Sequence, residues 1–397
     1  MATYYVDADR PDDLGNGLSF AAAWKTVAKV NATSFAPGDI ILFDSDEWAE
    51  TLNPATSGTA GNPITFGRYN ASGARPIFRA AASGRPEAIT LVAGRSYITL
   101  SFLRCVGGDL TQADALLESD SVTNIAEDCT FDGEGAADSC VGGSITLRRF
   151  FITGARDDGF TQHQTDTSIL EDGEITGCTQ GINNSGTNMT LTLTRVNIHD
   201  NGTAEIANLD NTTATVTRCR IKGKAKLFDG SLLPVTFNYC QFDGSNGSDA
   251  VSPELNTSSL TTFNNCTIWA NGKGKMAIQN AACNFVNTIL ANWNVAANLT
   301  SGGTFNKNFC LSYNVASGTV TADTNAITPA DPLFANPSAG NFRLGIGSPA
   351  IGVGTVLGVS AVDLAGNPVR NPPSLGAYES ATTINAATLN ATTLSIA

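Results

Sequence analysis

The middle of the chain repeats a short apolar motif, and this repeat constrains the fold more than any other feature. One apolar residue recurs at intervals of 21 to 26 residues, at Phe131, Ile152, Ile175, Ile198, Ile221, Phe242, Ile268 and Ile289. In six repeats a second apolar residue stands five positions earlier, at Leu147, Leu170, Leu193, Val216, Phe237 and Phe263. Two columns that keep their offset over six repeats indicate a repeated structural unit.

Each unit is a short alternation of apolar and polar residues that ends in Gly, Asn or Asp, which is typical of a strand followed by a turn. The longer ~3.6-residue periodicity of helices is missing from this part of the sequence. Units of this length cannot bury a face alone, so they gain a core by stacking on their neighbours. The repeat therefore predicts an all-β parallel β-helix over residues 81–325.

The cysteines fit this repeat. The chain has nine, an odd number, without a CxxC pair or a Cys/His cluster. Four of them, Cys129, Cys219, Cys240 and Cys266, stand two positions before the aligned apolar residue and should share its inward face. We expect reduced, packed thiols rather than disulfides or metal ligands.

Charge excludes some classes of partner. The chain carries 23 Lys and Arg against 36 Asp and Glu, a formal net charge of −13. Nucleic acids and anionic membranes attract basic surfaces, so we expect neither as a partner. No apolar run reaches the ~20 residues that cross a bilayer, and the acidic start "MATYYVDADRPDD" does not resemble a signal peptide. We therefore expect no membrane insertion and no export by the chain itself.

Both ends of the sequence resemble a known family. The opening "YYVDADRPDDLGNGLSFAAAWKTVAKVN" and the closing "DPLFANPSAGNFRLGIGSPAIGVG", with "SLGAYES", are similar to right-handed parallel β-helix proteins of the pectate lyase-like superfamily. The resemblance implies an N-terminal cap region over residues 1–80, with a capping helix in "SFAAAWKTVAKV". It also implies an irregular closing segment over 326–380. The uncharged tail 381–397 is a candidate oligomerisation or attachment segment.

Scarce basic residues gather in "TVTRCRIKGKAKLF", at residues 215–228. Because stacked coils align equivalent residues ~4.8 Å apart, the positions beside the aligned apolar residue should form outer columns. These columns hold Glu174, His199, Arg220, Lys222, Asp243 and Trp269. The set suits an acidic sugar: Arg220 would grip a carboxylate, Trp269 would stack on a ring, and Lys222 or His199 would act as base. Asp243 and Glu174 are further substrate-binding candidates, and the alternative is a ladder of charges that keeps the sheet soluble.

A second candidate site is "GARDDGFTQH", at residues 154–163. The adjacent Asp157 and Asp158 resemble the paired aspartates of polygalacturonases, which makes them catalytic candidates. The Gly-His-Gly element of that family is missing between this pair and Arg220. Adjacent acids also suit calcium, a cofactor that lyases of the superfamily often use, while "DDG" is equally a common turn. His163 is expected to be a loop residue.

Two functions follow from these patterns. The first is a glycan-recognising protein of a phage virion, such as a tailspike or fibre, that forms a homotrimer, binds surface polysaccharide and other virion proteins, and is assembled in a host cytoplasm. The missing signal, the reduced thiols and the apolar tail favour it. The alternative is an extracellular or periplasmic polysaccharide lyase or glycoside hydrolase that acts on acidic polysaccharide.

Overall fold

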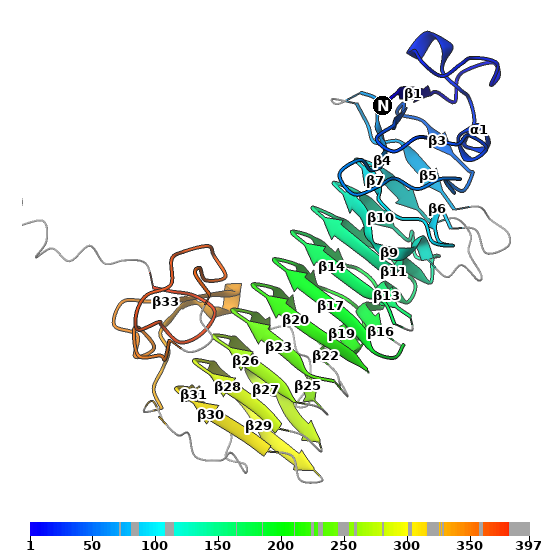
Figure 1. Ribbon diagram of the computed structural model, residues 1–397. Helices are drawn as coiled ribbons and strands as arrows, with labels where there is room; N and C mark the ends of the chain where they lie inside the picture. The colour runs from blue at the N-terminus through cyan, green and yellow to red at the C-terminus, as the bar shows by residue number, and fades with distance from the viewer. Residues whose placement is uncertain are drawn as a thin grey trace, which may run out of the picture.

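A computed structural model gives the fold of the chain (Figure 1). The residues that it describes are 1–70, 73–80, 87–107, 115–163, 165–184, 186–209, 211–223, 226–228, 233–244, 254–257, 260–279, 282–300, 304–315, 325, 327, 329–356 and 360–380. The predicted tail, 381–397, and Lys224 lie outside this part.

The strands stack into a parallel β-helix with three rows of strands, and each coil of the chain visits the rows in turn. Row 1 consists of β1 (Thr3–Val6), β2 (Ile40–Phe43), β4 (Ile64–Arg68), β7 (Ile98–Ser101), the ends of β9 (Ala115–Glu127) and β11 (Ser139–Arg148), β14 (Thr167–Glu171), β17 (Met189–Thr194), β20 (Thr212–Thr217), β23 (Val235–Asn238), β26 (Thr261–Asn264), β28 (Ala282–Val286) and β30 (Thr304–Asn308).

Row 2 follows row 1 in each coil. It consists of β3 (Glu47–Trp48), β5 (Ile77–Arg79), β8 (Arg104–Val106), β10 (Thr130–Asp132), β12 (Phe151–Thr153), β15 (Glu174–Thr176), β18 (Asn197–His199), β21 (Arg220–Lys222), β24 (Gln241–Asp243), the starts of β27 (Thr267–Gln279) and β29 (Ile289–Thr300), and β31 (Leu311–Tyr313). Row 3 consists of β6 (Ile89–Leu91), the starts of β9 and β11, β13 (Asp158–Gln162), β16 (Gln180–Asn184), β19 (Ala204–Leu209), β22 (Lys226–Phe228), β25 (Glu254–Thr257) and the ends of β27 and β29.

The register of the coils confirms the two apolar columns. Ile198 pairs with Ile221 and Ile221 with Phe242, and all three are fully buried. The column five residues earlier holds a stack of phenylalanine rings, with centroids 5.0 Å apart for Phe237 and Phe263. The four cysteines of the repeat are buried and free, as expected.

The alignment is wrong at its last member. Ile268 pairs with Leu290, not with Ile289, so the true column shifts by one residue in that coil. Ile289 instead belongs to a second apolar cluster formed with the C-terminal segment. The apolar pair Ile289 and Leu290 made both registers acceptable to a pattern based on hydrophobicity alone.

A single residue turns the chain from row 1 to row 2, and it has a left-handed backbone conformation in coil after coil. Its positions, three before the inward residue, are Asp128, Arg149, Asp172, Arg195, Arg218, Tyr239, Asn265 and Asn287, with φ between 48° and 57°. Such φ values are uncommon outside glycine and cost conformational energy for residues with a Cβ. We call these residues the left-handed corners. Contacts between coils must therefore stabilise them.

The N-terminal cap region predicted over residues 1–80 contains strands that pair like those of the later coils. β1 pairs with β2 and β2 with β4 in row 1. The predicted capping helix is split into a turn at Phe20–Ala22 and a short helix, α1 (Val27–Asn31), which Thr26 caps. Trp24 lies between the turn and the helix. Its side chain is buried, and its parallel bridge to Val6 gives it an extended backbone that interrupts the predicted helix.

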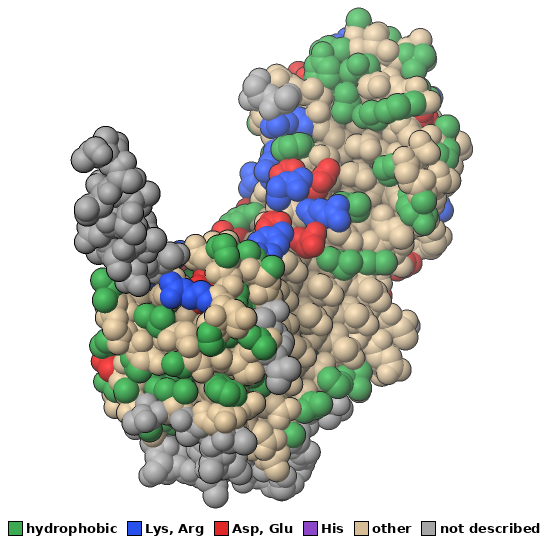
Figure 2. All heavy atoms as spheres, turned by 60° about the vertical axis from the view of Figure 1, so that its left-hand side comes forward, with side chains coloured by type: hydrophobic (Ala, Val, Ile, Leu, Met, Phe, Trp, Pro, Cys, Tyr) green, Lys and Arg blue, Asp and Glu red, His purple; other side chains and the backbone are tan. Residues whose placement is uncertain are grey.

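The C-terminal segment, residues 329–380, folds back along the last coils (Figure 1). It contains a short hairpin of β32 (Phe334–Asn336) and β33 (Asn341–Leu344), separated by a turn at Pro337–Ala339. Its apolar residues, among them Phe342, Leu375 and Tyr378, pack on the outer face of row 2. Figure 2 shows Lys, Arg, Asp and Glu side chains gathered in the bend between this segment and the upper part of the solenoid.

Two asparagine corners attach the C-terminal segment to the solenoid. Asn287 is buried, and its Nδ2 donates to the carbonyl of Thr355 at 2.7 Å while its Oδ1 accepts from the Thr355 N–H at 2.8 Å. Asn265 donates to the carbonyl of Ser374 at 3.3 Å. None of the helices in the described residues is long and apolar enough to cross a membrane.

Glu205 is a buried carboxyl group inside the solenoid. It is 1% exposed and accepts a hydrogen bond from Asn201 Nδ2 at 2.6 Å. Burial raises the pKa of Glu205 to about 8, although the hydrogen bonds from Asn201 act in the opposite direction. Gly223 packs closely beside it, since a Cβ there would stand 2.5 Å from Glu205 Oε1.

We predict that Asn287→Ala destabilises the protein by about 1–3 kcal/mol, because the partly buried amide and carbonyl groups of Thr355 lose their hydrogen bonds to Asn287. Chemical denaturation and limited proteolysis of the C-terminal segment measure the loss. Asn306→Ala is the matched control, since Asn306 is exposed and its side chain donates to Asn284 within row 1. Equal losses in the two variants would contradict the attachment role of Asn287.

We also predict that stability falls as pH rises from about 4.5 to about 8. In this window Glu205 is ionised in the unfolded chain and protonated in the folded one, so each pH unit costs up to ~1.4 kcal/mol. Glu205→Gln should flatten this slope and stabilise the protein most at the high-pH end. Denaturation curves at several pH values test it, and a slope unchanged in the variant would show that Glu205 does not titrate as described.

Candidate functional site

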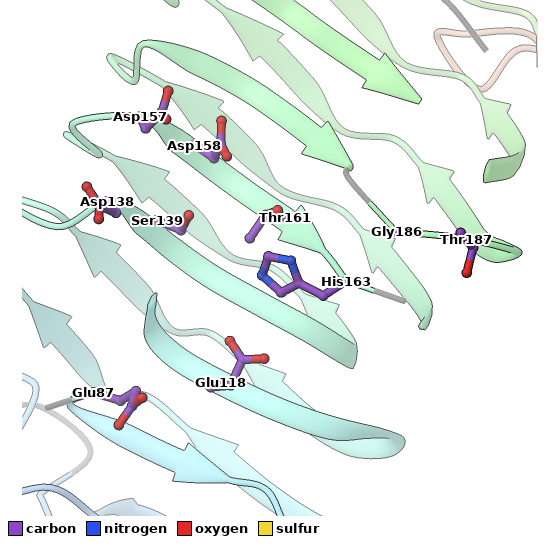
Figure 3. Close-up of a pocket in the computed structure, with 10 residues that line it drawn as sticks. All are labelled: Glu87, Glu118, Asp138, Ser139, Asp157, Asp158, Thr161, His163, Gly186 and Thr187. Carbon is purple, nitrogen blue, oxygen red and sulfur yellow. The ribbon is translucent and has the colours of Figure 1, made fainter. Parts of the chain in front are cut away.

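A hollow of about 840 Å³ lies on the outer face of row 3, where strands β6, β9, β11, β13 and β16 run side by side. Its titratable lining residues are Glu87, Glu118, Asp138, Asp157, Asp158 and His163. Figure 3 shows Asp157 and Asp158 at the start of β13, next to Asp138 and Ser139 at the start of β11. The stacking of coils thus gathers acids from four separate segments of the chain.

Asp158 is the most perturbed carboxyl group of this hollow. It is 8% exposed, and its Oδ2 accepts a hydrogen bond from Asn183 at 3.1 Å. Its Oδ1 is buried without a hydrogen-bond partner among the described residues. Burial and, second, the negative charge of Asp157 raise the pKa of Asp158 to about 7. Asp158 is therefore about half protonated at neutral pH.

Asp157 has a different environment from its neighbour. Its side chain is exposed, and Oδ1 accepts a hydrogen bond from Gln180 at 3.2 Å. The backbone N–H groups of both aspartates donate to the carbonyl of Asp138, at 3.0 Å and 2.9 Å. A buried carboxyl group beside an exposed one is an arrangement that can provide an acid and a base in one site.

Close packing between coils explains the glycine that follows this pair. Gly159 lies inside β13, and a Cβ there would stand 2.7 Å from the Gly181 carbonyl oxygen of the next coil. The glycine of "DDG" is thus required by close packing between coils rather than by a turn. His163 follows β13, is exposed, and lines the hollow beside Thr161 (Figure 3).

Three acids of the hollow were missed from the sequence: Glu87, Glu118 and Asp138. Asp138 had a usable signal, because it precedes Asp157 by 19 residues, close to one coil of the repeat. It forms an ion pair with Arg156. Glu87 and Glu118 gave no such signal, since the chain around them departs from the regular repeat.

The other predicted residues lie on row 2, a different row of the solenoid. Asn197 pairs with Arg220 and His199 with Lys222, so the expected neighbours do meet on adjacent strands. His199 is held between two carboxylates, with Nε2 at 2.8 Å from Glu174 Oε1 and Nδ1 at 2.8 Å from Asp200 Oδ2. Partial burial lowers the pKa of His199, but these hydrogen bonds outweigh it and raise the pKa. Both ring nitrogens of His199 are thus within hydrogen-bond distance of a carboxylate.

The outer column of row 2 is not exposed over its whole length. The expectation that Asp243 and Trp269 bind substrate is therefore wrong. Asp243 is fully buried and Trp269 is 7% exposed, because the C-terminal segment covers them. The Trp269 ring packs against Phe334 and Phe342, with centroids 5.9 Å and 5.6 Å away. Trp269 therefore has no open ring face on which a sugar would stack, and the predicted group of six residues is reduced to Glu174, His199, Arg220 and Lys222.

The calcium that the resemblance implied does not fit the described residues. They contain no group of three or more His, Cys, Asp or Glu side chains placed to hold a metal ion. Asp157 accepts a hydrogen bond from Gln180, and Asp138 forms an ion pair with Arg156. Asp158 is then left with too few oxygen neighbours for calcium, which takes about six to eight oxygen ligands.

Comparisons with known proteins give a fold and a limited sequence match. No protein-family profile matches the chain. Its sequence is 35% identical over 83 residues to a lacto-N-biosidase of Bifidobacterium longum, a match that spans 19% of this chain and 5% of that protein.

Among the solved structures that resemble this chain, two with a TM-score of 0.50 or more cover nearly all of it. XylC in complex with xylose has a TM-score of 0.58 at 11% identity and covers 95% of this chain and 98% of its own. The pectate lyase Pel9A has a TM-score of 0.50 at 14% identity, with coverage of 96% and 97%. At these identities the likeness concerns the backbone. The chain has the parallel β-helix fold of the pectate lyase-like proteins.

Proposed function

We propose that the protein is a glycoside hydrolase and that the hollow on row 3 is its active site. The observation that carries the proposal is the pair Asp157 and Asp158, in which burial raises the pKa of one member to about 7 while the other is exposed. Glycosidases use two carboxyl groups, one protonated and one charged, on either side of the bond that they cleave.

The roles follow from the two environments. Asp158 donates its proton to the glycosidic oxygen as the bond between that oxygen and the anomeric carbon breaks. Asp157 stabilises the positive charge on the sugar and takes a proton from the attacking water, whose oxygen forms the new bond to the anomeric carbon. Water is consumed, and two shorter saccharides leave. Asn183 and Gln180 orient the two carboxyl groups.

The charge of the hollow indicates the substrate class. Five of its lining residues are Asp or Glu, and among the described residues that line it none is Lys or Arg. A uronate would be repelled by this surface, whereas neutral and amino sugars are accepted. We therefore propose a neutral or amino-sugar glycan rather than the acidic polysaccharide expected from the sequence.

The names of similar proteins support a carbohydrate substrate. They are a lacto-N-biosidase, a protein bound to xylose and a pectate lyase. The virion role, the homotrimer and the extracellular or periplasmic location remain predictions of the sequence, as does lyase chemistry with Lys222 or His199 as base. A hydrolase pocket is compatible with a tailspike, because such proteins can cleave the glycan that they bind.

We predict that Asp158→Asn lowers hydrolysis of nitrophenyl glycosides of lacto-N-biose or xylose by about 10²–10⁴-fold, since the leaving oxygen loses its proton donor. Dinitrophenyl glycosides, whose leaving group needs no proton, should recover most of the rate. Asp157→Asn should be inactive on both kinds of substrate.

Asp9→Asn is the control for these variants, because it makes the same change at an exposed position in the N-terminal part. It should retain full activity. Equal losses of Asp158→Asn on both leaving groups would contradict its role as acid, and full activity of both Asp157→Asn and Asp158→Asn would remove the hollow as the active site.

We also predict that kcat/KM falls as pH rises through about 7, because Asp158 must be protonated to act as the acid. The pH profile on a nitrophenyl glycoside should lose this basic limb in Asp158→Asn. A basic limb that persists in the variant would assign it to another group.

A further inference from the structure

Row 2 carries a second hollow, about 480 Å³ in volume, on a different face from the row 3 pocket. Arg75, Arg149, Arg195, Phe151, Asp172 and Glu174 contribute to its lining. The floor follows the outer column of row 2, in which Phe151 pairs with Glu174, Glu174 with Asn197, and Asn197 with Arg220. The hollow therefore leads along the solenoid toward Arg220.

The left-handed residues between rows 1 and 2, the corners of the coils, line one side of this hollow. Arg149 bonds to Asp128 in the previous coil, with Nη2 at 2.8 Å from Oδ2, and Arg195 bonds to Asp172. Acid and arginine thus alternate from Asp128 to Arg195. The next corner is Arg218, another arginine, so the alternation stops and a positive charge follows a positive charge.

The coil of Arg218 carries cations and, among its described residues, no Asp or Glu. Arg218, Arg220 and Lys222 are close in sequence, and in the described part of the chain no ion pair is found for any of the three. Arg220 is exposed, and Arg218 and Lys222 are partly exposed. We call these three residues the cationic coil.

The C-terminal segment ends the open surface directly after the cationic coil. Gln241, which pairs with Arg220, is buried and accepts a hydrogen bond from the Tyr378 hydroxyl at 2.6 Å. Tyr239, the next corner, is 1% exposed. In the C-terminal segment, the guanidinium of Arg343 lies 5.3 Å from the Tyr378 ring centre. The cationic coil is thus the last coil whose row 2 face is exposed before the C-terminal segment covers the row.

We propose that the cationic coil binds an anionic polysaccharide, a chain that bears carboxylate or sulfate groups and runs along row 2. The protein has a net charge of −13, so an anionic chain is attracted to this local excess of cations and repelled by most of the remaining surface. Arginine side chains bind such groups through paired hydrogen bonds. The neighbouring acids Glu174 and Asp200 are engaged by His199, which reduces their repulsion.

A polysaccharide fits this surface better than a nucleic acid. Nucleic-acid binding surfaces are broad and strongly basic, whereas here the acids Asp172 and Glu174 lie on row 2 just before the cationic coil. The proposal goes beyond the hydrolase and does not depend on it, since the cationic coil and the row 3 hollow lie on different faces. The neutral substrate and the anionic ligand would bind at separate sites.

The test measures binding of polygalacturonate and heparin to the whole chain at low salt, with dextran as the neutral comparison. We expect both polyanions to bind, dextran not to bind, and affinity to fall with salt. Arg220→Ala with Lys222→Ala should weaken polyanion binding tenfold or more, because it removes two charged donors. The thermal unfolding temperature of this variant should equal that of the parent, because Arg220 is exposed and Lys222 is partly exposed.

Arg148→Ala with Lys307→Ala is the matched control, because it removes one arginine and one lysine from row 1. It should bind as the parent does. Unchanged binding in the cationic-coil variant, equal loss in the control, no polyanion binding at all, or equally tight binding of double-stranded DNA would each overturn the proposal.

The two proposals can fail separately. Asp158→Asn should retain polyanion binding, and Arg220→Ala with Lys222→Ala should retain hydrolysis of nitrophenyl glycosides. Loss of polyanion binding in Asp158→Asn would place the anionic ligand in the row 3 hollow and contradict the second site.

Discussion

The structure depends on the register between one coil and the next. Parallel backbone pairing places Ile198, Ile221 and Phe242 in one interior column, and every outward side chain takes its neighbours from the coils before and after it. Since side chains alternate across a strand, a slip of one residue would expose this column and bury the polar residues beside it. The surfaces on rows 2 and 3 exist only because this register holds.

The left-handed corners show how the register is maintained where the chain bends. Their backbone conformation is unfavourable for residues with a Cβ, so contacts between coils must compensate. In the middle of the solenoid the compensation is ionic, as in Arg149 with Asp128. Farther along it is an amide contact, with Asn287 Nδ2 at 3.3 Å from Asn265 Oδ1. The same positions therefore provide a charged surface in one region and an attachment for the C-terminal segment in another.

The C-terminal segment decides which part of row 2 can meet a ligand. It buries Asp243 and Trp269 and leaves Arg220 and Lys222 at the edge of the covered region. On row 3, coils nearer the N-terminus form an acidic hollow with a partly protonated Asp158. One solenoid thus presents two faces of opposite charge, which suit different ligands.

The sequence by itself determined the fold, the inward columns, the reduced cysteines and the neighbours of the cationic coil, because aligned repeats specify which residues lie side by side. It also singled out Asp157 and Asp158. Only the tertiary structure decided that Asp158 is buried, that Asp138, Glu118 and Glu87 join it, and that Trp269 is covered. Coil length before residue 139 is irregular, and the C-terminal segment folds back onto coils that lie far from it in the sequence, as in the bond from Tyr378 to Gln241, at a separation of 137 residues. A periodic pattern carries no information about such contacts.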